Sequence, residues 1–195
     1  MNDTTHDTTH DTTHDKTHDK THDTVTVWRA SAAEAAAQVD ALADVLIDCV
    51  HGGASVSFMA PLPRDKALAF WQAVAEGVAR GDRALLLAAN GAGQVLGTVQ
   101  LVLAQPENQP HRADVAKMLV HRSARRHGVA ARLMTAVEDV ARTENKTVLV
   151  LDTVTGGDAE RLYARAGWQR LGSVPDYALM PDGALCATTF FFKRI

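Results

Sequence analysis

The pattern of apolar and polar positions predicts short strands alternating with amphipathic helices from residue 25 onward. The first strand is expected at 25–30, where apolar and polar residues alternate. Ser31 and Glu34 then form a capping box, which predicts one long Ala-rich helix to about Val50. We expect the other elements at these positions: a helix at 64–80, two hairpin strands at 84–90 and 95–105, a strand at 112–121, a helix at 127–144, a strand at 147–152, a helix at 158–166, and two strands at 168–174 and 184–194.

This order combines an antiparallel meander with one strand-helix-strand unit. The crossover through the helix at 127–144 makes the strands at 112–121 and 147–152 parallel. We therefore predict an α/β fold with a central mixed, mostly antiparallel sheet and helices on both faces. Ligands of such sheets bind at the carboxyl ends of parallel strands, which here means close to Val120 and Asp152.

Composition narrows the class of protein. The chain has 195 residues, 46% of them hydrophobic, which suits a single domain with a sizeable core. The net charge of -3 comes from the first 24 residues, because residues 25–195 carry 18 basic and 17 acidic side chains. This near neutrality favours neither nucleic acid nor an anionic membrane as a partner. No apolar run has the length of a membrane span, and Cys49 and Cys186 lie far apart, so we expect a cytoplasmic protein.

Residues 1–24 form a low-complexity His/Asp/Thr tail that repeats a four-residue unit. Between Met1 and Val25 the tail has no apolar residue, so we expect it to be disordered and residues 25–195 to form a single domain. The alternative is metal capture, since imidazole is a good zinc or nickel ligand. Thr and Asp are poor helix formers, and we therefore predict no preorganised metal site from the five histidines, His6, His10, His14, His18 and His22.

A basic, glycine-containing turn precedes the helix at 127–144. The first turn of a helix presents free backbone N–H groups and a partial positive charge, and Gly128 and Ala130 would let an anion approach them. A solvated basic loop is the other interpretation. The arginines that would add full charges suited to phosphate oxygens are Arg125, Arg126 and Arg132.

The spacing Arg125-x-x-Gly128-x-Ala130 resembles the acetyl-CoA pyrophosphate signature of the GNAT acetyltransferases. Residues 50–56, 112–120 and 181–183 resemble the tabtoxin-resistance type within that family. The resemblance implies a GNAT fold over residues 25–195, in which the fourth and fifth strands splay apart around the pantetheine arm. It also implies that acetyl-CoA is bound by Met118, Leu119, Val120, Arg125, Arg126, His127, Gly128, Val129 and Ala130.

The same resemblance implies direct acetyl transfer to an amine. Asp152, which ends a buried strand, is the best candidate for the base, although it could serve only as a cap. Asp114 is the second candidate, in a place where related sequences tend to carry the longer Glu. Tyr163 matches the tyrosine that the family places beside the cofactor sulfur, while its helical spacing also fits an ordinary core position. Gly156 departs from the Asn that many relatives have there.

His51 and Tyr177 are the candidate walls of the acceptor site. His51 could instead be the cationic last turn of a helix, and Tyr177 is expected in the loop between the last two strands. The resulting hypothesis is an N-acetyltransferase for a small metabolite or toxin, possibly a tabtoxinine-β-lactam-like amino acid, in a chain that could form a homodimer. The alternatives are an acyl-CoA-binding sensor without turnover and a protein that acts through its metal-binding tail.

Overall fold

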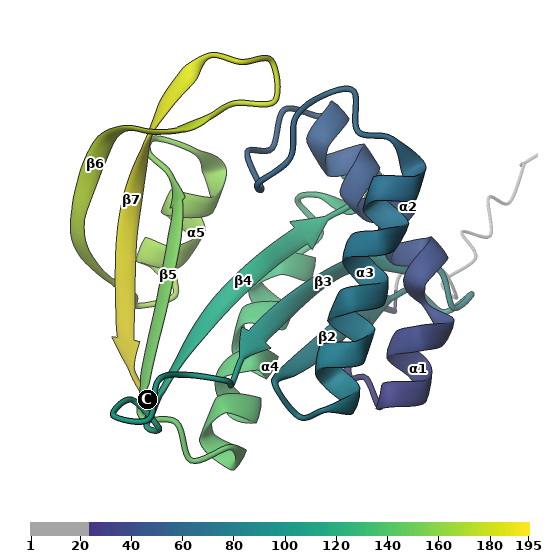
Figure 1. Cartoon of the computed structure of the whole chain (residues 1–195), viewed down its shortest axis with the longest axis horizontal. Coiled ribbons are helices and arrows are strands. Elements are labelled where there is room, and N and C mark those ends of the chain that lie inside the picture. The colour runs from purple at the N-terminus through teal and green to yellow at the C-terminus, as the bar shows by residue number, and fades with distance from the viewer. Residues whose placement is uncertain (1–23) are drawn as a thin grey trace, which may run out of the picture.

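The computed structural model describes residues 24–195 and contains one seven-stranded sheet in the order β1-β2-β3-β4-β5-β7-β6 (Figure 1). The predicted low-complexity tail and its five histidines lie almost entirely outside these residues. The strands are β1 (Thr26–Arg29), β2 (Arg83–Ala89), β3 (Val95–Val102), β4 (Arg112–Val120), β5 (Val148–Val154), β6 (Gln169–Leu179) and β7 (Leu185–Arg194). The helices are α1 (Ala32–Ala37), α2 (Val39–His51), α3 (Arg64–Ala79), α4 (Val129–Thr143) and α5 (Asp158–Arg165), with a 3-10 turn at Arg122–Ala124.

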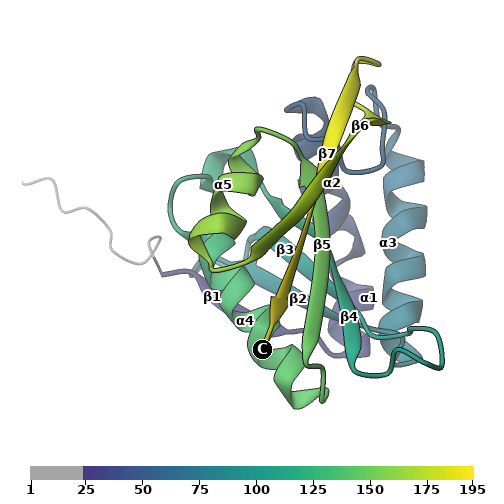
Figure 2. The same cartoon turned by 90° about the vertical axis from the view of Figure 1, so that its left-hand side faces the viewer.

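The predicted mixed sheet with helices on both faces is confirmed. Among the described strands β4 and β5 form the parallel pair, and the other neighbours are antiparallel. Helices α1, α2 and α3 cover one face, whereas α4 and α5 cover the other (Figure 2). Successive residues of a strand point to opposite faces, so Leu85 and Leu87 pack under the first layer and Leu86 packs under α4. None of the helices within residues 24–195 has an apolar stretch of the length that a bilayer requires.

The prediction of one long helix from Ser31 to Val50 is wrong, because the chain leaves helical geometry at Gln38 and forms two helices. The capping box is present, with the Glu34 amide donating to Ser31 Oγ and the Ser31 amide donating to the Glu34 carboxylate. Gln38 then leaves helical geometry, with φ -97° and ψ 7°, between α1 and α2. The buried side chains of Ala35, Val39 and Leu42 keep a helical spacing through the break, which is why the apolar pattern does not reveal it.

The strand expected at 168–174 is longer than its pattern indicates. β6 continues to Leu179, so Tyr177 lies in a strand and its expected place in a loop is wrong. Pro175 and Asp176 look like a turn, but they form an irregularity in the pairing with β7, where Asp176 has φ 51°. Proline is tolerated there because β6 is the edge strand of the sheet.

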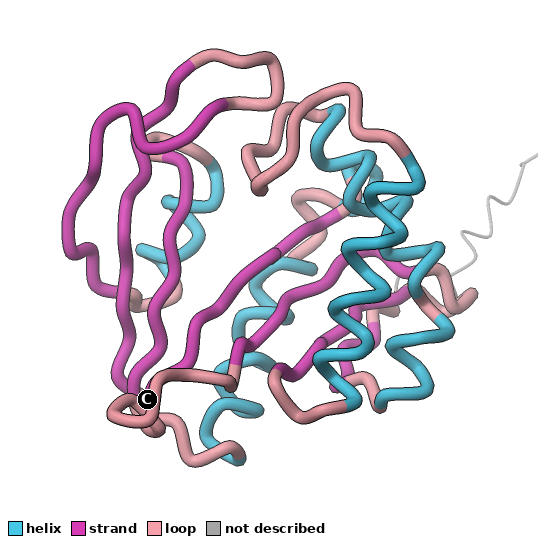
Figure 3. The backbone as a smooth tube through the Cα atoms, viewed as in Figure 1, coloured by secondary structure: helices cyan, strands magenta, loops and turns pink. Residues whose placement is uncertain are grey.

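The sheet opens between β4 and β5. Their pairing is confined to residues 112–114 of β4 and 148–150 of β5. Beyond these residues β4 stays with β3 as far as Val120, and β5 stays with β7 as far as Val154, so the two strands diverge (Figure 3). This divergence leaves backbone groups of both strands without a neighbouring strand, and it positions the site described next.

Candidate active site

At one end of the divergence, the start of α4 is open to a ligand. Gly128 is the N-cap of α4 with φ 77°, a conformation that favours glycine, and no side chain caps the helix. A Cβ added at Gly128 would meet no atom within 4 Å. The first amides of α4 are therefore accessible, as an anion-binding helix start requires. The helix begins at Val129, two residues later than predicted, because residues 125–128 form a turn in which Arg126 and Gly128 have positive φ.

The basic side chains around this turn differ in their partners. Arg125 and Arg126 are exposed, and Arg125 Nε donates to the Val120 carbonyl at 3.3 Å. His127 is also exposed. Arg132 instead donates to the Val25 carbonyl at 2.9 Å, which directs it toward the first strand and away from the turn. The charges nearest to the open amides of α4 therefore come from residues 125–127.

Asp48, near the end of α2, contacts the residues that precede this turn. Its carboxylate accepts hydrogen bonds from the Arg122 amide and Arg122 Nε, both at 2.8 Å, and lies 3.4 Å from His121 Nε2. Burial alone would raise the pKa of Asp48, but the hydrogen bonds from Arg122 and the charges of His121 and Arg122 outweigh it and lower that pKa. Asp48 was not predicted from the sequence. An acidic residue in the last turn of a helix opposes the helix dipole, which is the signal that a cationic partner must lie nearby.

Asp152 lies further along the divergence, on β5, directly opposite Phe190 of β7. Its neighbours Leu149 and Leu151 are buried against α4, so Asp152 points to the opposite face of the sheet. The carboxylate is exposed, yet the surrounding protein raises its pKa by desolvation. The positive charge of Lys117 opposes this rise and the negative charge of Asp114 adds to it.

Asp114 is the less available of the two carboxylates. Arg112 Nη1 donates to one of its oxygens, and Gln105 Nε2 donates to the other at 3.0 Å. Within residues 24–195, by contrast, no other residue donates a hydrogen bond to the Asp152 side chain. A base needs a free lone pair, so the geometry favours Asp152 over Asp114 for proton transfer.

Tyr163 on α5 is 5% exposed and packs between Trp168 and Phe191, with ring centroids 6.1 Å and 6.0 Å away. This environment fits the core position that its helical spacing allowed. Burial raises its pKa, and the negative charge of Asp152 adds to the rise, so the phenol keeps its proton at neutral pH. Its hydroxyl has no hydrogen-bond partner among the described residues. A neutral phenol of this kind can act as a proton donor.

The predicted acceptor side lies where two segments that are distant in the sequence meet. The loop at 52–63 meets the turn between β6 and β7, through a hydrogen bond of 2.9 Å from Ser55 Oγ to the Leu179 carbonyl and one of 2.9 Å from the Ala60 amide to the Pro181 carbonyl. Figure 1 shows this contact above the divergence of β4 and β5. His51 does not face an acceptor freely, because its Nε2 accepts a hydrogen bond from the Leu62 amide at 3.2 Å.

Tyr177, on β6, is the other predicted wall residue. It is 53% exposed and stacks edge-on against Phe190, with ring centroids 5.5 Å apart. Phe190 is the cross-strand neighbour of Asp152, so Tyr177 lies on the side of the sheet to which Asp152 points. Gly156, where many relatives have Asn, has φ 80°, and its amide donates to the Glu160 carboxylate.

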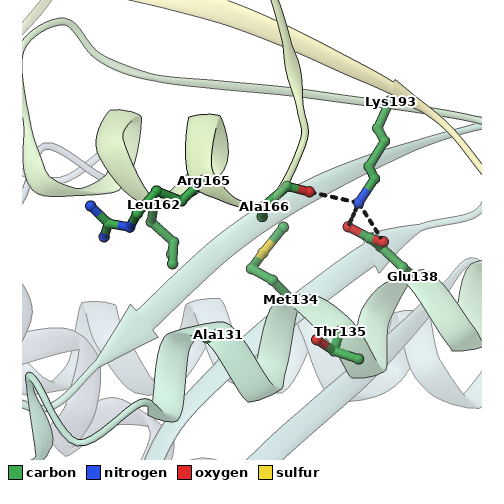
Figure 4. Close-up of a pocket in the computed structure, with 8 residues that line it drawn as sticks. All are labelled: Ala131, Met134, Thr135, Glu138, Leu162, Arg165, Ala166 and Lys193. Carbon is green, nitrogen blue, oxygen red and sulfur yellow. Dashed lines mark hydrogen bonds and ion pairs between the residues drawn. The ribbon is translucent and has the colours of Figure 1, made fainter.

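A separate pocket of about 270 Å³ lies between α4 and α5, on the face of the sheet opposite Asp152 (Figure 4). Its acidic group, Glu138, is neutralised by Lys193, whose Nζ lies 2.8 Å from both carboxylate oxygens. We therefore assign no proton transfer to it. Among residues 24–195, no group of three or more His, Cys, Asp or Glu side chains is placed to hold a metal ion. The residues lining the pocket are Ala131, Met134, Thr135, Glu138, Leu162, Arg165, Ala166 and Lys193.

Comparison with known proteins agrees with this geometry. An N-acetyltransferase described as uncharacterized, from the hisH-hisA intergenic region of Azospirillum brasilense, is 34% identical over 113 residues, which are 57% of this chain and 65% of that relative. The match thus spans slightly less than two thirds of the relative's length. Two solved structures share the fold. The ribosomal-protein-alanine N-acetyltransferase from Brucella melitensis has a TM-score of 0.73 and 20% identity, over 87% of this chain and 99% of that one.

The other solved structure is yncA from Salmonella typhimurium, determined with its cofactor acetyl-CoA. It has a TM-score of 0.70 and 19% identity, over 87% of this chain and 93% of that one. The model of the acetyltransferase (GNAT) family matches residues 50–168, more than half of the chain. The protein therefore belongs to the GNAT family of acetyltransferases.

Proposed function

We propose that the protein is an N-acetyltransferase that moves the acetyl group of acetyl-CoA directly to the amine of a small metabolite or toxin. The observation that carries this proposal is the divergence of β4 and β5, with an open helix start at one end and an accessible carboxylate, Asp152, further along β5. Family membership supports the same reaction type.

The described residues fit acetyl-CoA as the donor substrate. We infer that the pyrophosphate binds at Arg125, Arg126, His127, Gly128, Val129 and Ala130, where open amides and exposed cations meet. The free edge of β4 at Met118, Leu119 and Val120 would bind the pantetheine arm as an added strand. Acetyl-CoA supplies a thioester-activated acetyl group, and unpaired amides of the diverging strands can stabilise the carbonyl oxygen as it gains negative charge.

Acetyl transfer also requires that the amine loses a proton and that the departing sulfur gains one. An alkylamine with a pKa of about 10 is mostly protonated at neutral pH, and forming the neutral, nucleophilic amine costs roughly 4 kcal/mol. We infer that Asp152 removes that proton, directly or through a water. The acceptor nitrogen then bonds to the acetyl carbon as the carbon-sulfur bond breaks and its electron pair stays on sulfur. Tyr163 donates its proton to that sulfur, and the second proton lost by the nitrogen passes through water to restore the Tyr163 phenol. Asp114, held by Arg112 and Gln105, would act on Asp152 through its charge.

A second candidate function is an acyl-CoA-binding sensor without turnover. The engagement of Asp114 by Arg112 and Gln105, together with glycine at position 156, favours this alternative. Both candidates predict binding of coenzyme A, and only the first predicts chemistry.

Release of free thiol from acetyl-CoA separates the two. The full-length protein would be mixed with acetyl-CoA and a panel of amino acids, polyamines, aminoglycosides and β-lactam amino acids, while calorimetry measures coenzyme A binding in parallel. Amine-dependent thiol release supports the enzyme. Binding without release under every amine supports the sensor, and an absence of binding contradicts both.

Turnover of a β-lactam amino acid would support membership of the tabtoxin-resistance type. A protein lacking residues 1–24 should keep its activity, whereas a function carried by the tail would be lost.

A further inference from the structure

Lys117 occupies a bulge in β4, at the place where β4 leaves β5. Thr98 pairs with Leu119 and Gln100 pairs with Ala116, so Lys117 and Met118 together oppose Val99 alone. The backbone of Lys117 has φ 49°, which is uncommon for a residue with a side chain. A bulge of this kind redirects a side chain, and here it sends Lys117 toward the layer of α3.

The ammonium group of Lys117 has only neutral partners. Its Nζ donates to Ser57 Oγ at 3.1 Å and lies 5.8 Å from the ring centroid of Phe70. No carboxylate of residues 24–195 lies within 4.0 Å of it. Burial lowers the pKa of Lys117, the charge of Asp152 raises it, and the charge of Arg83 lowers it further. Desolvation of a cation is costly unless a nearby anion offsets that cost. The half-buried ammonium of Lys117 has no ion-pair partner, so its surroundings suit the binding of an anion.

Ser57 is itself held in an unusual conformation. It has φ 75°, and it lies in the loop at 52–63 that is fixed against the turn between β6 and β7. Residues kept in the left-handed region cost of order 1–3 kcal/mol and cluster where a ligand is clamped. The neighbouring Phe58 is buried and stacks edge-on against Phe70 at 5.2 Å, which gives this corner an apolar floor.

Lys117 and Asp152 carry opposite charges on the two diverging strands, and both side chains point to the face of the sheet that α3 covers. Each affects the pKa of the other, yet they do not form an ion pair within 4.0 Å. An acceptor with an amine and an anion can therefore direct its amine to Asp152 and its anion to Lys117. One ammonium and one hydroxyl offer donors to the two oxygens of a carboxylate, and the arginines and open amides that suit the pyrophosphate lie apart from them, at residues 125–130.

We propose that Lys117 and Ser57 form an anion subsite for the acceptor, which is an amino acid or another amine that carries a carboxylate. This inference rests on the proposed acetyl transfer and names the class of its acceptor. In the reaction the carboxylate is bound and unchanged, while the amine loses its proton to Asp152 and forms the new bond to the acetyl carbon.

Matched acceptors test the subsite directly. For lysine, ornithine and phenylalanine, kcat/KM for acetylation would be compared with kcat/KM for the carboxamide and for the decarboxylated amine of each. The wild type should prefer the carboxylate form by about tenfold or more for at least one of the three. In Lys117→Met the preference should fall to within about threefold, because the variant keeps the length of the side chain and removes its charge.

Lys66→Met is the matched control. Lys66 is exposed, and its Nζ lies 5.9 Å from the ring centroid of Phe58, beside the proposed subsite but outside it. This variant should keep the carboxylate preference of the wild type. Ser57→Gly removes the hydroxyl and relieves the positive φ, and it should lower the preference by about threefold even if Lys117→Met does not fold.

The outcomes separate the subsite from the reaction. Equal kcat/KM for the carboxylate and carboxamide forms overturns the subsite and leaves acetyl transfer standing. A preference that survives both Lys117→Met and Ser57→Gly, or that Lys66→Met abolishes equally, also overturns it. Thiol release with polyamines or aminoglycosides but with none of these amino acids overturns the subsite alone, whereas coenzyme A binding without thiol release under every amine tested overturns the proposed function and the subsite together.

Discussion

At the scale of single residues, Asp152 combines accessibility with a raised pKa. It is exposed on the face of the sheet opposite α4, and other residues leave its lone pairs free. Desolvation and the negative charge of Asp114 raise the pKa of Asp152, and the positive charge of Lys117 opposes this rise. Perturbed carboxylates of this kind are frequent at catalytic sites, because a base must release and regain a proton near the working pH.

We predict that Asp152→Asn lowers kcat by about 10² to 10⁴-fold, the range typical of a lost general base. The dissociation constant for coenzyme A should change by less than about threefold, because the carboxylate acts in the transition state and not in donor binding. Stopped assays of thiol release and calorimetry measure the two quantities. The control is Asp114→Asn, which should cost less than Asp152→Asn. Equal losses of kcat and of coenzyme A affinity in Asp152→Asn would show a structural role instead.

The pH dependence should report the same carboxylate. Asp152 acts as a base only when it is deprotonated, so kcat falls as the pH falls through its raised pKa. The charge of Lys117 holds that pKa down, and Lys117→Met should therefore move the acid limb of the profile to higher pH. An acceptor with a strongly basic amine, whose pKa is about 10, titrates well above this range. An acid limb that stays in place in Lys117→Met, or that moves equally in Lys66→Met, would contradict the assignment.

Some of these residues are visible in the sequence and others are not. Asp152 could be predicted because it follows an apolar run, although β5 continues past it to Val154, and Tyr163 because its place in the sequence resembles that of a tyrosine in the family. The direction of Lys117 could not, since it depends on a bulge that shifts the register between β3 and β4. Asp48 and its partner Arg122 are 74 residues apart, and an apolar pattern carries no information about such a contact.

At the scale of elements, glycine is required at the start of α4 for two separate reasons. One is the backbone conformation at Gly128, and the other is access to the amides. Gly81, after the end of α3, shares the first reason only. It has φ 79°, and a Cβ there would also meet no atom within 4 Å.

We predict that Gly128→Ala and Gly81→Ala destabilise the protein equally, by about 1 to 2 kcal/mol, because each puts a Cβ at positive φ. Thermal unfolding should show a decrease in Tm of roughly 2–8 °C for both. Only Gly128→Ala should weaken coenzyme A binding, by about fivefold or more, since its methyl group stands at the helix start. An equal effect of the two variants on affinity would locate the anion site elsewhere.

Elements were predicted best where periodicity and end signals agree. The strand β4 and the C-terminal end of α4 are examples, because the apolar stripe and the flanking polar residues indicate the same end points. The break at Gln38 was missed because the stripe continues through it. The extension of β6 was missed because Pro175 and Asp176 are turn residues by composition, and only pairing with β7 keeps them in a strand.

At the scale of the whole molecule, the order of elements predicts the parallel pair but not the neighbours of the last two strands. An alternating pattern shows which residues share a face, and it does not show that β7 lies between β5 and β6. The contact of the loop at 52–63 with the turn between β6 and β7 joins residues more than 100 positions apart. Contacts of this length define the acceptor side, which explains why its residues were the hardest to predict.

A divided sheet also needs a connection between its halves. Pairing between β4 and β5 is short, and on the other face Glu138 of α4 binds Lys193 of β7. Lys193 Nζ also donates to the Ala166 carbonyl at 2.7 Å, and Glu138 Oε1 accepts a hydrogen bond from Trp168 Nε1 at 3.2 Å. The side chains of Glu138 and Lys193 are 10% and 22% exposed, so water can replace little of this contact.

We predict that Lys193→Met lowers the free energy of unfolding by about 3 kcal/mol, because it leaves a buried carboxylate without its main cation. Tm should fall by roughly 6–12 °C in thermal unfolding followed by circular dichroism. Arg161→Met is the control, because it breaks an exposed ion pair with Asp158 and should cost less than about 1 kcal/mol. If the two variants lose similar stability, the Glu138 and Lys193 pair is not what connects α4 to β7, and packing of α4 against the sheet must connect them alone.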